Sequence, residues 1–210
     1  FILTLEVYFL MYHVNKKRSV KAYYDAYAEF YDRRYAKLQQ AKYEIGLSLL
    51  KDTHADFAVV GDLGCGTGNL SKLLSSRANH VICIDISEKM LEVTRRKVEN
   101  KNVHIICADV DHLPLRDDTL SLAFTITLLQ NVPDPFYNLM ELSRVCKNGA
   151  YLLISTLRKK MDINHLMDIF KKTNIELREL IDDPHIEDII FLGQLQKCNN
   201  GNKSCGIIYK

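Results

Sequence analysis

Short apolar runs alternate along most of the chain with stretches in which apolar residues recur every three or four positions. The runs are typical of strands buried on both faces, whereas the wider spacing is typical of amphipathic helices. The pattern predicts strands over residues 57–63, 81–86, 103–108, 120–128, 149–156, 175–181 and 188–195. It predicts intervening helices over residues 68–76, 87–100, 135–147 and 165–173.

This alternation predicts an α/β fold. Repeated strand, helix and parallel strand units place helices on both faces of one sheet. We expect a Rossmann-like, doubly wound, seven-stranded sheet that is mostly parallel, closed by an antiparallel hairpin over residues 175–195. Ligands of such sheets bind beyond the carboxyl ends of the strands.

Residues 23–50 predict two further helices ahead of the sheet. Their aromatic residues recur at helical spacing, which predicts one shared face for Tyr23, Tyr27, Phe30, Tyr31 and Tyr35. Residues 1–11 are apolar but shorter than a bilayer span, and basic residues follow them rather than precede them, unlike a signal peptide. We expect an N-terminal extension over 1–19, disordered in part and with Met11 as a candidate start. One domain over 20–195 and a tail over 196–210 would follow.

Glycines gather where the first predicted strand gives way to a helix. Gly61, Gly64, Gly66 and Gly68 all fall within residues 59–70. Glycine accepts positive φ and lets a ligand approach bare backbone, and the following helix presents free N–H groups to whatever lies on the turn. The segment therefore predicts a small-molecule cradle at the end of a strand.

Carboxylates at the ends of the predicted strands restrict the kind of ligand that this cradle would bind. Asp85 and Asp109 end the second and third predicted strands, placed to accept from ribose hydroxyls and from an exocyclic amine. Asp62, just before the turn, would repel a pyrophosphate and suit an ammonium group. Because Asn69 replaces the last glycine or alanine of G-x-G-x-x-G, the pattern disfavours a nicotinamide or flavin dinucleotide.

These segments resemble the class I S-adenosylmethionine-dependent methyltransferases, close to the methyltransferase type 11 pattern. The matching motifs are residues 62–68, 83–91 and 108–109 and the segment 128–135 after the fourth strand. The resemblance implies S-adenosyl-L-methionine as cofactor and a helical lid in the tyrosine-rich N-terminal segment. It implies cofactor contacts from Asp62, Gly64, Cys65, Gly66, Gly68, Asp85, Ile86, Asp109, Val110, Thr125, Gln130, Tyr27 and Tyr31.

Departures from the family pattern leave the proton chemistry open. Gln130 and Asn131 stand where relatives often carry Glu-His or His-His, which removes an obvious general base. The remaining candidate bases are His112, Tyr31 and Asp134, and we assign no catalytic residue. Methyl transfer needs a base only where the nucleophile is protonated, so positioning is the main task of the site.

Cysteine spacing and charge add context. The six cysteines form no C-x-x-C pair, so we expect no metal site, buried free thiols at Cys83 and Cys107, and a reducing cytoplasm. The net charge is only +2, yet residues 16–44 carry eight Lys or Arg against four Asp or Glu. Either an anionic partner or a solvated helix face would explain that stretch.

Three classes of function fit these observations. The first is in-line methyl transfer to a small-molecule acceptor, which we favour. The second is methylation of RNA or a translation factor with a small activating subunit as partner. The third is a non-catalytic cofactor-binding scaffold, which the complete set of glycines and carboxylates disfavours. We expect no membrane partner.

Overall fold

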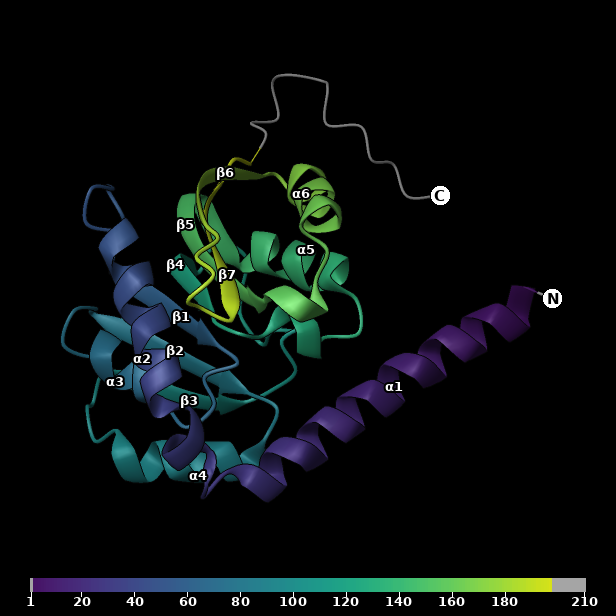
Figure 1. Cartoon of the computed structure of the whole chain (residues 1–210), viewed down its shortest axis with the longest axis horizontal. Coiled ribbons are helices and arrows are strands. Elements are labelled where there is room, and N and C mark those ends of the chain that lie inside the picture. The colour runs from purple at the N-terminus through teal and green to yellow at the C-terminus, as the bar shows by residue number, and fades with distance from the viewer. Residues whose placement is uncertain (1, 198–210) are drawn as a thin grey trace.

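The computed structural model describes residues 2–197, and one mixed sheet organises them (Figure 1). Within these residues the sheet has seven strands, ordered β3-β2-β1-β4-β5-β7-β6. Strands β1 to β5 are parallel, and β7 runs antiparallel to both β5 and β6. The strands are β1 (Val59–Leu63), β2 (His80–Asp85), β3 (Val103–Cys107), β4 (Leu120–Thr125), β5 (Cys146–Leu157), β6 (Ile175–Ile181) and β7 (Asp188–Leu195). The predicted Rossmann-like fold is confirmed.

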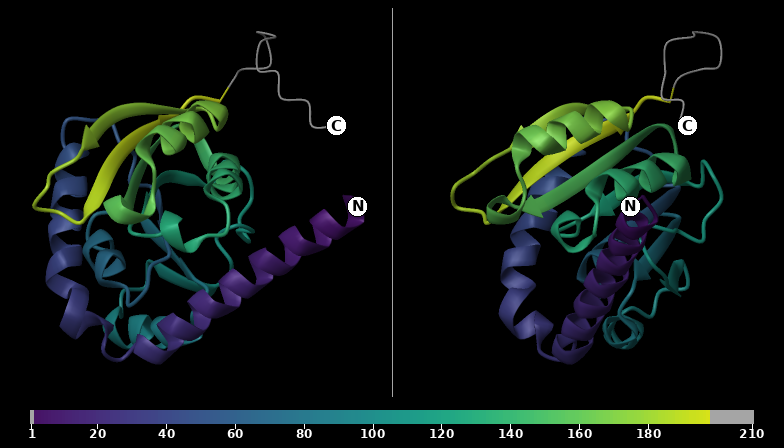
Figure 2. Two further views of the ribbon diagram at one scale, coloured as in Figure 1. Left: turned by 45° about the vertical axis from the view of Figure 1, so that its right-hand side comes forward. Right: turned by 90° about the vertical axis from the view of Figure 1, so that its right-hand side faces the viewer.

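Helices cover both faces of this sheet (Figure 2). In β4, Leu122 and Phe124 pack on the side of α2, α3 and α4, whereas Ala123 packs on the side of α5 and α6. The alternation follows from the two-residue period of a strand. The helices are α1 (Ile2–Tyr27), α2 (Tyr31–Leu49), α3 (Asn69–Leu74), α4 (Glu88–Lys97), α5 (Pro135–Val145) and α6 (Ile163–Lys172), with 3-10 turns η1 (Leu129–Asn131) and η2 (Arg158–Lys160).

Three predicted boundaries were wrong between β4 and β5. The fourth strand ends at Thr125, because Thr127 takes a left-handed conformation with φ of 56° and the short helix η1 follows. Helix α5 ends at Val145, and β5 begins at Cys146 rather than at residue 149. A bulge between the β4 and β5 registers takes up the extra residues, where Gly149 has a φ of 78°.

The N-terminal region also differs from expectation. Helix α1 begins at Ile2, so residues 2–19 of the expected extension are helical. The expected division into an extension over residues 1–19, one domain over 20–195 and a tail over 196–210 stays a prediction. Figure 1 shows the N-terminal half of α1 extending away from the sheet. Most of the expected tail, residues 198–210, lies outside the described residues.

A turn splits the predicted aromatic stripe. The chain turns over residues 28–30, so Tyr27 ends α1 and Tyr31 begins α2. Tyr23 stacks on Tyr27 with ring centroids 4.7 Å apart, and Tyr31 lies 4.9 Å from Tyr35. The prediction of one shared helical face was therefore wrong, because that face exists only within a continuous helix.

The cysteine prediction was right for Cys83 and wrong for Cys107. Cys83 is fully buried, whereas Cys107 is exposed because it ends β3, which lies at the edge of the sheet. Over residues 2–197, no His, Cys, Asp and Glu side chains cluster in a way that would hold a metal ion. In the same residues, every helix is too short or too polar to cross a bilayer.

Candidate active site

A cavity with about 700 Å³ of empty space opens beyond the carboxyl ends of β1 to β4. Seven of the residues expected in the cofactor site line it: Tyr31, Gly64, Gly66, Asp85, Ile86, Asp109 and Val110. They come from four different elements or turns, which the parallel sheet brings to one edge.

The glycine turn forms the floor of this cavity. Gly66 has a φ of 54°, and a Cβ built there would meet no atom within 4 Å, so the backbone lies open toward the cavity. Gly68 serves packing instead: a Cβ there would come within 2.5 Å of Thr94 Cγ2 on α4. In this turn, Gly66 therefore leaves the backbone accessible from the cavity, and Gly68 lets helix α4 approach closely.

Asp85 at the end of β2 faces the cavity with a fixed carboxylate. Its two oxygens accept from the backbone N–H groups of Gly66, at 2.9 Å, and Ser87, at 2.8 Å. Burial raises the pKa of Asp85, and these two hydrogen bonds oppose that rise. Each oxygen keeps a free lone pair, so the carboxylate can accept from two neighbouring hydroxyls at once.

A lysine from α1 spans the far side of the cavity. Lys17 Nζ lies 2.5 Å from Asp109 Oδ2 and 2.8 Å from Asp111 Oδ2. Burial alone would lower the pKa of Lys17, but the two carboxylates outweigh it and the pKa is raised. Nothing in the helical spacing of α1 distinguished this lysine from its neighbours, so sequence reasoning missed it.

Thr127, just after β4, lines the cavity in a conformation that β-branched residues rarely adopt. Its backbone N–H donates to Ser155 Oγ at 2.9 Å, and its carbonyl accepts from the Gln130 side chain at 2.5 Å. Its hydroxyl accepts from Lys42 Nζ at 2.9 Å and donates to Asp188 Oδ2 at 2.8 Å. These bonds over-determine the strained turn and fix the cavity wall.

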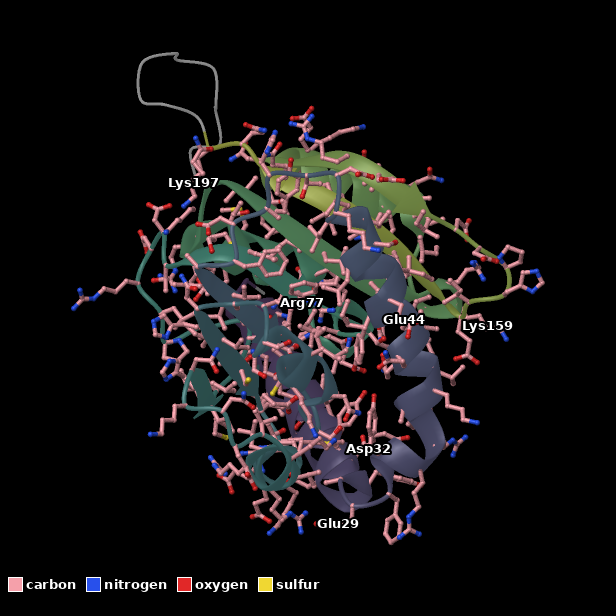
Figure 3. The ribbon with its side chains drawn as sticks, turned by 90° about the vertical axis from the view of Figure 1, so that its left-hand side faces the viewer. Glu29, Asp32, Glu44, Arg77, Lys159 and Lys197 are labelled. Carbon is pink, nitrogen blue, oxygen red and sulfur yellow. The ribbon has the colours of Figure 1, made fainter. Side chains whose placement is uncertain are left out.

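Helix α2 stabilises the glycine turn through hydrogen bonds to Asp32. Asp32, labelled in Figure 3 near one end of α2, accepts from Thr67 Oγ1 at 2.6 Å and Asn69 Nδ2 at 2.9 Å. Lys97 of α4 lies 2.6 Å from the other oxygen of Asp32. Burial would raise the pKa of Asp32, but Lys97 and the two neutral donors outweigh it, so the pKa is lowered. The sequence offered no signal for this contact because the residues lie far apart along the chain.

Six expected cofactor residues lie outside the lining of the main cavity. Asp62 and Cys65 line a smaller adjoining cavity, together with Gly64 and Gly66. The other four are Gly68, Thr125, Gln130 and Tyr27. Thr125 is buried, and Tyr27 is 42% exposed on the outside of α1. Tyr24 of α1 lines the cavity instead, and its hydroxyl accepts from Asn131 Nδ2 at 2.9 Å.

The candidate bases fall in different places. His112 and Asp134 line a separate groove between α1 and α5, and Asp134 caps α5 by accepting from Phe136 N–H. Tyr31 does line the main cavity, but burial raises its pKa well above the ordinary value. A tyrosine held protonated in this way can donate a hydrogen bond at neutral pH but is a poor base.

Comparisons with known proteins agree with this geometry. Residues 61–154 match the family model described as "Methyltransferase domain". The chain is 38% identical over 144 residues to malonyl-[acyl-carrier protein] O-methyltransferase of Marinomonas sp. (67% of this chain, 52% of that protein). The enzyme of the same name from Hamiltonella defensa is 30% identical over 190 residues, covering 90% of this chain and 68% of that protein.

The chain belongs to the class I S-adenosylmethionine-dependent methyltransferases. Demethylmenaquinone methyltransferase of Clavibacter sepedonicus is 37% identical over 145 residues, covering 66% of this methyltransferase and 58% of that one. The matches thus span between about half and two thirds of these relatives' lengths. In fold, the methyltransferase is similar to a complex from Haloferax volcanii of the Trm112 methyltransferase activator with a methyltransferase. That likeness has a TM-score of 0.68 at 16% identity and covers 83% of this chain and 98% of that one.

The family's cofactor is S-adenosyl-L-methionine, and the cavity of this methyltransferase fits it. The strand order β3-β2-β1-β4 sets Asp109, Asp85 and the glycine turn in a row, matching the order of adenine, ribose and amino-acid tail. The open backbone at Gly66 leaves room for a ligand to pass close to the turn. Asp85, Asp109 and Val110, from which we expected contacts with the ribose and the adenine, all line this cavity.

Proposed function

We propose that this methyltransferase acts on a small-molecule acceptor with an apolar body. The observation that carries the proposal is the wall of the cavity beyond the cofactor residues. It is mostly apolar, with Val20, Leu128, Val132 and Pro133. A wall of this kind, with few polar groups, suits a compact ligand better than a polymer.

The residues of this wall suit orientation rather than proton abstraction. S-adenosyl-L-methionine supplies, when bound, an electrophilic methyl group on a sulfonium. The Asn131 amide and the hydroxyls of Tyr24 and Tyr31 are positioned to orient an acceptor, and burial raises the pKa of both tyrosines. The apolar residues exclude water. An acceptor atom that is already nucleophilic, such as a carboxylate or enolate oxygen or an enolate carbon, fits this set.

The names of the relatives support this acceptor class. They describe transfer to malonyl-[acyl-carrier protein] oxygen and to demethylmenaquinone, whose reacting groups are small. Three lysines of the basic stretch that could have met RNA form ion pairs within the protein. Lys17 pairs with Asp109 and Asp111, Lys21 pairs with Asp25, and Lys42 pairs with Asp188.

The test uses labelled methyl donor, the purified chain and fractionated cell extract. We expect label to enter the small-molecule or lipid fraction. Entry into RNA, or into protein other than an acyl group held by a carrier protein, would overturn the acceptor proposal in favour of the second class of function. Transfer that requires an added subunit would support an activating partner. Absence of transfer alongside tight cofactor binding would favour a scaffold.

The ribose assignment has its own test. We expect Asp85→Ala to weaken binding of S-adenosylhomocysteine by about 10- to 100-fold, because hydrogen bonds to a charged group are lost. Isothermal titration calorimetry measures this directly. Asp117→Ala, which changes an exposed aspartate paired with Arg144, is the matched control. Unchanged affinity in Asp85→Ala would contradict the ribose assignment without bearing on the acceptor.

A further inference from the structure

A second, smaller cavity adjoins the main one on the side of α2. Its lining includes Tyr31, Gln39, Asp62, Gly64, Gly66 and Ile126, of which Tyr31, both glycines and Ile126 also line the main cavity. The two spaces are therefore neighbours that share one wall. The smaller one lies over the ends of β1 and β4. It is next in line after Asp109, which follows β3, and Asp85, which ends β2.

Gln39 stands out among the residues of this wall. Its side chain is 6% exposed, and its Oε1 has no hydrogen-bond partner among the described residues. Leaving a buried carbonyl oxygen unpaired costs about 1 to 3 kcal/mol, so such an atom calls for a donor. The other end of the same amide is used: Nε2 donates to the Tyr31 hydroxyl at 3.1 Å.

The charges around the smaller cavity decide which donor fits. Among the described residues that line it there is one carboxyl group, that of Asp62, and no Lys, Arg or His. Asp62 is 3% exposed and is held in place by Ser71 Oγ at 2.5 Å. A wall with an unpaired carbonyl oxygen and a carboxyl group attracts a cationic donor and repels an anion.

We propose that Gln39 of α2 is the residue that recognises the α-ammonium group of the cofactor's amino-acid tail through Oε1, while its Nε2 holds Tyr31 against the main cavity. The proposal rests on the cofactor assignment and is independent of the acceptor. In this arrangement one amide connects the tail to the tyrosine that borders the methyl-transfer cavity. Gln39 thereby becomes a specificity-determining residue that distinguishes ligands with the tail from ligands without it.

Calorimetry with three ligands tests the proposal. S-adenosylhomocysteine carries the whole tail, its decarboxylated form keeps the amine alone, and 5′-methylthioadenosine has neither group. We expect Gln39→Leu to weaken the first two by about 10- to 100-fold, as for a hydrogen bond to a charged group, and to leave 5′-methylthioadenosine within about twofold. Gln40→Leu is the matched control, because Gln40 is exposed and bonds only to Glu44 on the same helix.

The contrary outcomes are distinct. Equal weakening of all three ligands would mean a structural role for Gln39 and would overturn the proposal. Loss restricted to S-adenosylhomocysteine, with its decarboxylated form unaffected, would mean that Gln39 binds the carboxylate, which also overturns it. Failure of 5′-methylthioadenosine to bind the unmodified protein would instead count against the cofactor site as a whole.

A conservative variant guards against effects on folding. Gln39→Glu keeps the shape of the side chain and replaces the amide by a carboxylate, which can accept from an ammonium group and from the Tyr31 hydroxyl. We expect it to retain or exceed the unmodified affinity for both amine-bearing ligands. A loss as large as that of Gln39→Leu would overturn the recognition of an ammonium group.

Discussion

At the scale of single residues, burial changes the chemistry of the carboxyl group that precedes the glycine turn. Asp62 accepts from Ser71 but lies in the sheet interior, and burial raises its pKa to about 7, with the charge of Asp85 adding to the rise. Its side chain is therefore largely protonated in slightly acidic solution. The sequence argument treated Asp62 as an ordinary carboxylate, whereas the structure makes its charge depend on pH near neutrality.

This shift predicts a pH-dependent stability. An unfolded aspartate ionises near pH 4, so between pH 4 and 7 the folded chain holds a proton that the unfolded chain has lost. Stability due to Asp62 falls over that window as pH rises and is constant above it. Asp62→Asn removes this dependence. The melting temperature of Asp62→Asn minus that of the unmodified protein should therefore increase by more than about 3 °C between pH 4.5 and pH 7.5. Calorimetric melting at both pH values is the measurement, and a constant difference would contradict the shift.

At the scale of elements, α2 is joined to the sheet by a buried ion pair. Lys42 Nζ lies 2.7 Å from Asp188 Oδ1 at the start of β7, and the two side chains are 5% and 0% exposed. Ser155 of β5 and Thr127 donate to the other oxygen of Asp188. The pair thus connects α2, the turn after β4, β5 and β7 at the edge of the cavity. It holds Thr127 in its left-handed conformation.

Removing one partner of this pair should be costly. We expect Lys42→Met to destabilise the fold by about 3 to 5 kcal/mol, because Asp188 would be left as an uncompensated buried charge. The double variant Lys42→Met/Asp188→Asn should recover part of that loss. Urea unfolding measures both, with Lys37→Met as an exposed control on the same helix. A loss below about 1 kcal/mol for Lys42→Met would show that the pair contributes little.

At the scale of the whole molecule, the two N-terminal helices enclose the open edge of the sheet. The C-terminal half of α1 contributes Lys17, Val20 and Tyr24 to the cavity, and Asp25 accepts from Ser87 Oγ at 2.6 Å. The N-terminal half extends outward, where Leu10 and Met11 are 63% and 57% exposed. One helix therefore has a half that lines the cavity and a half that extends away from the sheet (Figure 1).

Hydrogen exchange should distinguish these halves. We expect S-adenosylhomocysteine to slow amide exchange in residues 16–27, because the bound ligand holds this half of α1 against the cavity and suppresses local opening. Residues 3–10 should be unaffected. Mass spectrometry of the exchanged protein, with and without ligand, is the measurement. Equal protection along all of α1 would mean that the helix moves as one unit.

The local sequence contained most of the fold and the centre of the site. Strand and helix periods identified the elements of the sheet, and the carboxyl ends of parallel strands brought Gly64, Gly66, Asp85 and Asp109 to one edge. The positions of these residues were predictable because each position is set by where the residue's own strand ends. The boundaries at Thr127 and Cys146 were not predictable, because a hydrogen-bond network and a bulge decide them.

Contacts between distant segments were decided only by the tertiary structure. Lys17 reaches Asp109, Lys42 reaches Asp188, and Gln39, whose Oε1 is unpaired, lines the smaller cavity. No regular spacing and no sequence motif indicates these contacts, because each joins an N-terminal helix to a strand end or turn far along the chain. The sequence by itself determined the cofactor and the sheet that holds it. The packing of α1 and α2 decided what surrounds the ligand, since only packing determines which side chains become buried together.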